Sequence, residues 1–147
     1  MGCIAPPAVK PASPQVSDTV QKQMQDLQRA ASVSAIYFLE VPSPDEMIAA
    51  KVMQGMLASG RSTTAVDGLV DLLKLSQKVP SGVAIGVVGQ NLAINAGTLK
   101  NALEKFKGQR VAGAVYLLAD RKNATALKEQ ANLLGLRLIA LIDKTGE

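Results

Sequence analysis

Polar and charged residues that are able to bind a ligand follow each of the short apolar stretches of this chain. They are Glu40, Gln90, Asn91, Asp120, Arg121, Lys122 and Asp143. In an open sheet of parallel strands, ligands bind beyond the carboxyl ends of the strands, so these side chains are expected to share one rim. The three carboxylates could hold Mg²⁺ through their oxygens, and Lys122 could contact a phosphate. This rim predicts a ligand-binding or phosphoryl-handling site.

Other features of the sequence argue against catalysis. Acidic residues that follow strands often cap the next helix, which explains Asp120 without a ligand. The chain has no His, and therefore lacks the commonest general base and the commonest zinc ligand. The segment Gly86–Asn91 matches neither the Gly-x-Gly-x-x-Gly fingerprint nor a P-loop. We therefore predict that the protein is not an enzyme and binds no cofactor or metal.

Four apolar runs rich in Val, Ile and Leu are expected to be strands. They are Ser34–Val41, Val83–Val88, Val111–Leu118 and Leu136–Ile142. Runs of this kind suit a parallel sheet that is covered by helices. The predicted fold is an α/β three-layer sandwich with a four-stranded, mainly parallel sheet in the order α-β-α-α-β-α-β-α-β. Its strand connections should be right-handed. The rim described above would then make it a small Rossmann-like domain, which is one of the functional alternatives.

The helices are expected from apolar residues at helical spacing and from capping signals. Ser43, Pro44 and Glu46 match a capping box with Pro at the first helical position, and this helix should end at Gly60. Further helices are expected over Thr63–Lys78, Thr98–Lys107 and Asn123–Leu134. The long connection left between Gly89 and Gly97 is a candidate binding loop.

A leading helix is expected over residues 17–32, where apolar residues form a narrow seam. Val20, Met24 and Leu27 are separated by steps of four and three residues, and the other side of the helix is rich in Gln. The seam could pair with a partner helix, as in a cytoplasmic protein-interaction module. It could equally lie against its own domain, which is the interpretation we favour.

Composition limits the classes of function. The 147 residues are enough for one domain with a real core, predicted over residues 17–147, and 48% of them are apolar. The net charge is a mild +4 with scattered Lys and Arg, and aromatic residues make up only 3%. A nucleic-acid partner is therefore not expected. Cys3 is the single cysteine, which excludes a disulfide within one chain.

Residues 1–16 contain four prolines before position 15 and are expected to form an extended tether. The Gly2-Cys3 pair ahead of this tether resembles the mature start of a bacterial lipoprotein, with a signal segment removed and Met1 added. The resemblance implies lipidation of Cys3, and Ile4 rather than Asp after it implies the periplasmic side of the outer membrane.

On this hypothesis the protein is a non-enzymatic accessory or assembly part of an envelope complex of the secretion, conjugation or pilus type. Its partners would be other envelope proteins and, through the lipid, the membrane. Two alternatives remain for the start of the chain. N-myristoylation wants Ser or Thr where Pro6 stands, and the stretch could also be a plain tail with an incidental cysteine in a cytoplasmic protein.

Overall fold

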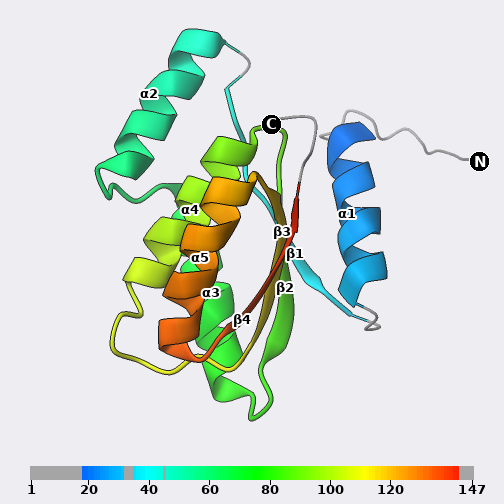
Figure 1. Cartoon of the computed structure of the whole chain (residues 1–147). Coiled ribbons are helices and arrows are strands. Elements are labelled where there is room, and N and C mark those ends of the chain that lie inside the picture. Colours follow the sequence, from blue (N-terminus) through cyan, green and yellow to red (C-terminus); the bar gives the residue numbers. More distant parts are fainter. Residues whose placement is uncertain (1–17, 32–34, 45, 143–147) are drawn as a thin grey trace, which may run out of the picture.

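The computed structural model describes residues 18–31, 35–44 and 46–142 of the chain. Helices and strands follow one another in the predicted order α-β-α-α-β-α-β-α-β (Figure 1). The elements are α1 (Asp18–Ala31), β1 (Tyr37–Glu40), α2 (Met47–Ala58), α3 (Thr64–Lys78), β2 (Val83–Val88), α4 (Leu92–Glu104), β3 (Gly113–Ala119), α5 (Arg121–Leu134) and β4 (Arg137–Ile142). The α/β fold predicted from the sequence is confirmed.

The four strands form one all-parallel sheet in the order β1-β2-β3-β4. When strands follow one another across a sheet, connections of a single hand place all connecting helices on one face. The structure has this arrangement, because α3, α4 and α5 contact one face while α1 lies on the other (Figure 1). Helix α2 packs on α4 at the outside of the helical layer.

Successive strand residues point to opposite faces of the sheet and contribute to two hydrophobic cores of unequal size. Ile85 and Val87 of β2 point into the larger core with α3, α4 and α5, whereas Val88 belongs to the smaller core beneath α1. In the smaller core, Val20 and Leu27 are 1% and 0% exposed. The seam of α1 therefore packs on the chain's own sheet, as the favoured interpretation expected.

Two helix starts differ from the prediction. Helix α2 begins at Met47, and its N-cap Glu46 makes no side-chain capping bond, so the predicted capping box at Ser43 is absent. Residues 41–44 carry two prolines, and each proline disfavours helical geometry in the residue before it. The helix therefore starts beyond them.

Helix α4 begins at Leu92 instead of Thr98, so the predicted long loop between Gly89 and Gly97 does not exist. The side chain of Asn91 caps this helix by accepting a bond from the Ile94 N–H at 3.1 Å. Gly97 lies inside the helix, where a Cβ would come within 3.2 Å of Cβ of Leu57 in α2. A glycine that looks like a helix breaker in the sequence instead allows two helices to approach.

Candidate functional site

The residues predicted to form a ligand-binding rim follow the carboxyl ends of the strands. Glu40 ends β1, Gln90 follows β2, and Arg121 and Lys122 begin α5 after β3. These four side chains are exposed. Asp143 and the predicted lipidation site Cys3 lie outside the described residues. The parallel topology thus produces the shared edge that the sequence predicted.

Two rim residues serve the backbone of their own helices. Asp120 caps α5, because its Oδ1 accepts a bond from the Asn123 N–H at 2.7 Å. Asn91 caps α4 in the same way. Both side chains stabilise helix starts by satisfying N–H groups that have no partner within the helix.

The rim does not gather metal ligands in the part of the chain that the structure describes. No three His, Cys, Asp or Glu side chains lie close enough there to hold a metal ion. Over the same residues, no helix is both long and apolar enough to cross a membrane.

A buried amide cluster lies just behind the rim. The Gln23 side chain of α1 exchanges two hydrogen bonds with the backbone of Gly89, at 2.9 and 2.8 Å. From the opposite side of the sheet, Nδ2 of Asn95 donates to the same carbonyl at 3.0 Å. Oδ1 of Asn95 has no hydrogen-bond partner among the described residues. The cluster joins α1, β2 and α4, and we interpret it as structural.

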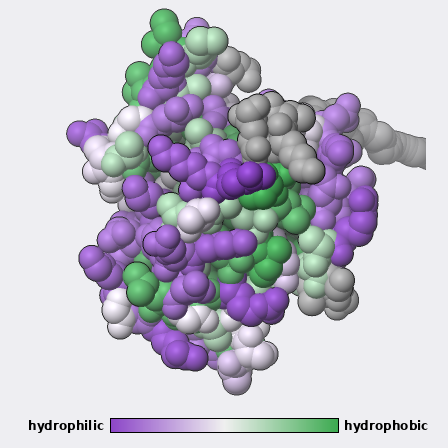
Figure 2. Space-filling view, in the orientation of Figure 1, coloured by the Kyte–Doolittle hydropathy of each residue, from purple (hydrophilic) through white to green (hydrophobic). Residues whose placement is uncertain are grey.

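The feature that stands out from the rest of the surface is the outer side of α2. Five large hydrophobic side chains are exposed over the described ranges, and three belong to this helix: Met47, Ile48 and Val52, at 73%, 78% and 59%. Figure 2 shows hydrophobic residues along α2 at the top of the view. Exposed hydrophobic residues that gather on one side of a helix mark interaction sites more often than single exposed residues do.

Two contacts with α4 hold α2 with this side outward. Ala50 and Leu57 point inward and are buried, and Leu57 packs against Gly97. Nδ2 of the buried Asn101 donates to the carbonyls of Leu57 and Arg61, at 3.0 and 3.2 Å. These bonds link the last turn of α2 and the turn that follows it to α4, and the Leu57 carbonyl also accepts from the Gly60 N–H at 3.0 Å. The apolar side is therefore presented by a fixed element.

Charges of both signs adjoin this surface, since the exposed Glu46 directly precedes Met47 and Lys51 lies within α2. Residues 47–66 contain Lys51 and Arg61 and no Asp or Glu. Lys51 is exposed on the same side of α2 as Ile48 and Val52. A partner with an acidic margin around an apolar centre would complement it.

The sequence analysis did not separate the exposed Met47, Ile48 and Val52 from the buried residues of their helix. The signal that could have separated them is the period, because Ala50, Met53 and Leu57 share one side, and Ile48 and Val52 share the opposite one. Gln23 was not singled out in the sequence, although it lies three residues after Val20, on the seam itself. Asn101 carried no recognisable signal.

Comparisons of this chain with protein-family models, with curated proteins and with solved structures found no match in any of the three.

Proposed function

We propose that this protein is a non-enzymatic, lipid-anchored component of the bacterial envelope that docks a partner protein through α2. The observation that carries the proposal is the exposed apolar side of α2, formed by Met47, Ile48 and Val52. Removing apolar surface from water is favourable, so a partner that covers these side chains would gain binding free energy.

The chemistry of α2 favours a protein partner over a membrane surface. Helices that lie in a membrane interface are typically rich in Lys and Arg on one side and in Trp, Phe and Leu on the other. Helix α2 has one Lys, no aromatic residue and a single Leu that is buried. Met and small residues instead give an adaptable surface of the sort that accepts another helix.

The partner is expected to be a different protein and not a second copy. A symmetric pair formed through α2 would bring two Lys51 ammonium groups into one interface, and the exposed Glu46 that precedes each helix is the acidic residue nearest to them in the sequence. Like charges that meet in an interface are unfavourable. We therefore expect an apolar groove with acidic residues at its margin.

The anchor is proposed from sequence features alone. Gly2 and Cys3 resemble a lipidation site, and the proline-rich residues 1–16 would separate it from the domain. Intact mass of the protein expressed from its complete gene in its own host tests this part. Diacylglyceryl and acyl mass on Cys3 is the expected result, and an unmodified Cys3 would overturn the anchor while leaving the docking surface open.

The docking surface is tested by placing a photoreactive residue at Ile48 or at Val52 in the native host. Leu133 is a matched control, because it is a single exposed apolar residue on α5, at 86% exposure. We expect both α2 positions to cross-link to one and the same protein and Leu133 not to do so. Ile48→Glu should abolish its co-purification, while Leu133→Glu should not.

Three results would contradict the docking proposal. These are cross-links from α2 to lipid only, cross-links to a second copy of the chain, and equal cross-linking from Leu133. The circular dichroism spectrum of each variant should match that of the native chain, so that loss of the partner does not merely report unfolding.

A further inference from the structure

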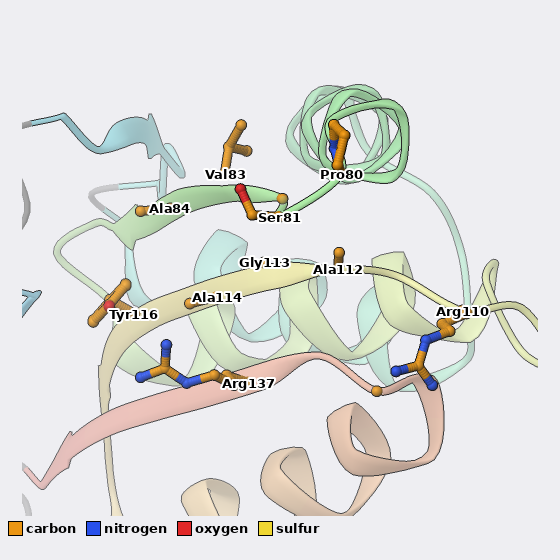
Figure 3. A pocket seen from close by; sticks show the side chains of 12 residues that line it. Pro80, Ser81, Val83, Ala84, Arg110, Ala112, Gly113, Ala114, Tyr116 and Arg137 are labelled. Atoms are coloured by element: carbon orange, nitrogen blue, oxygen red, sulfur yellow. The ribbon is translucent and has the colours of Figure 1, made fainter.

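A hollow of about 430 Å³ lies at the amino ends of β2, β3 and β4, at the opposite end of the sheet from the predicted rim (Figure 3). It opens on the face that α1 covers farther along the strands, since Ala114 and Tyr116 belong to the smaller core. Its volume falls within the range of small-molecule sites, roughly 300–1,000 Å³.

Small residues and backbone form the floor of the hollow. A Cβ added to Gly82 would lie 2.2 Å from the backbone nitrogen of Gly113, so the two lead-in segments meet backbone to backbone. Both glycines have positive φ, of 75° and 109°. Farther along the strands, Ala84 and Ala114 contribute only methyl groups. The floor is therefore shallow, closely packed and partly apolar.

The charge of the hollow is positive only. Arg110 and Arg137 line it, and no Asp or Glu does. Neither arginine forms an ion pair with any residue that the structure describes. In Figure 3 the two guanidinium groups lie toward opposite ends of the hollow. That of Arg110 stands beside Gly135, where a Cβ would be 3.2 Å from its Nη1.

A tyrosine hydroxyl accompanies Arg137. The strand register pairs Arg137 with Ala114, so Tyr116, two residues farther along β3, shares its face of the sheet. Tyr116 is only 4% exposed and lines the hollow, and its hydroxyl makes no hydrogen bond with another described residue. A tyrosine hydroxyl at the wall of a hollow is able to donate a hydrogen bond to a ligand oxygen.

We propose that this hollow binds a small organic dianion. Arg137 and the Tyr116 hydroxyl hold one anionic group, Arg110 holds the other, and the apolar middle of the ligand lies over Ala114. Guanidinium groups suit both carboxylates and phosphates, because their planar forks match either geometry. Both arginines are exposed, so water competes for them and the affinity should be modest.

The test is a titration of the ¹⁵N-labelled full chain with succinate, with 3-phosphonopropionate, in which a phosphonate replaces one of the two carboxylates, and, as the single-charge control, with acetate. We expect saturable shifts at the amides of Gly82, Gly113 and Gly135. Both dianions should bind about tenfold more tightly than acetate, since a second charge-assisted contact is added. The tighter of the two dianions then identifies the ligand as a dicarboxylate or a phosphate compound.

Arg137→Gln and Arg110→Gln should each weaken dianion binding about tenfold, whereas Arg61→Gln, an equal charge change elsewhere, should not. Tyr116→Phe keeps the ring that packs in the smaller core and removes only the donor, so it should weaken binding without altering the spectrum away from the hollow. The proposal is overturned by the absence of saturable shifts at about 10 mM ligand. It is also overturned by shifts that map to the rim, or by equal weakening in Arg61→Gln.

Discussion

The side chain of Gln23 donates to the Gly89 carbonyl at 2.8 Å and accepts from the Gly89 N–H at 2.9 Å. It does so from a position that is only 5% exposed. Gln23→Ala should therefore lower the free energy of unfolding by about 1–3 kcal/mol, because buried backbone groups lose their partner. Gln21, exposed on the same helix, is the control, and Gln21→Ala should change stability by less than about 0.5 kcal/mol. Urea unfolding measures both, and equal midpoints would contradict the structural role of Gln23.

Two glycines should respond in opposite directions to the same substitution. A Cβ at Gly89 would lie 2.4 Å from Oδ1 of Asn95 and 2.6 Å from the carbonyl of Val41, so Gly89→Ala should destabilise the fold by about 1–3 kcal/mol. A Cβ at Gly55, inside α2, would meet nothing within 4 Å. Gly55→Ala should stabilise by about 0.4–1 kcal/mol, because alanine restricts the unfolded chain. Thermal unfolding of the pair checks the prediction, and a shift of the same sign in both would refute it.

At the scale of elements, Asn101 decides how firmly α2 is held. Asn101 is 7% exposed, and its amide donates to the carbonyl of Leu57 in the last turn of that helix and to the carbonyl of Arg61 in the turn that follows. Asn101→Ala should raise the hydrogen-exchange rates of α2 amides selectively, because the substitution removes the side-chain hydrogen bonds that link the end of α2 to α4. Asn132→Ala, at an exposed position of α5, is the control. Uniformly faster exchange over α2, α3 and α4 would mean that α2 is not a separately opening element.

The strands were the most predictable elements, and the reason is their surroundings. Val83–Val88 forms β2 with the bounds that the sequence predicted, because a strand covered on both faces needs an unbroken apolar run. The start of α4 was missed because Gly97 resembles a break when its neighbour is unknown. Its packing against Leu57, which lies 40 residues earlier, is information that local patterns do not carry.

The candidate sites were predicted less well than the fold. The carboxyl-end rim follows from parallel topology alone, but the side chains that share an edge need not converge, and Asp120 and Asn91 act as helix caps instead. Arg137 did carry a signal, since a charge inside the apolar run Leu136–Ile142 requires that one face of that strand be open. Arg110 lies outside every predicted helix and strand, so its place in the same hollow as Arg137 is visible only in the folded chain.

The whole molecule is asymmetric about its sheet. Among the described residues, three helices contact one face, whereas α1 is the one helix on the other (Figure 1). On that second face Phe38, Ile139 and Leu141 are only partly buried. Each proposed surface belongs to a part that the larger core does not enclose: α2 outside the helical layer, and the hollow at the open end of the second face.

This asymmetry predicts a hierarchy of opening within the native state. The amides of β2 and β3 lie between both cores and should exchange only through global unfolding. Helix α1 is held by Val20, Leu27 and the Gln23 bonds, so it should open at a lower free energy. Helix α2 packs mainly on α4 and should open independently of α1. Native-state hydrogen exchange at increasing urea measures all three.

The variant Leu27→Ala tests whether α1 opens separately from the rest of the domain. Leu27 is fully buried, so its truncation should cost about 2–5 kcal/mol. If α1 is a separate unit, this loss accelerates exchange in α1 and leaves the rates in α2 unchanged. Exchange of α1, α2 and β3 with one common free energy would show a single cooperative unit. In that case a partner on α2 would stabilise the whole chain, because binding to the native state alone would shift the one unfolding equilibrium.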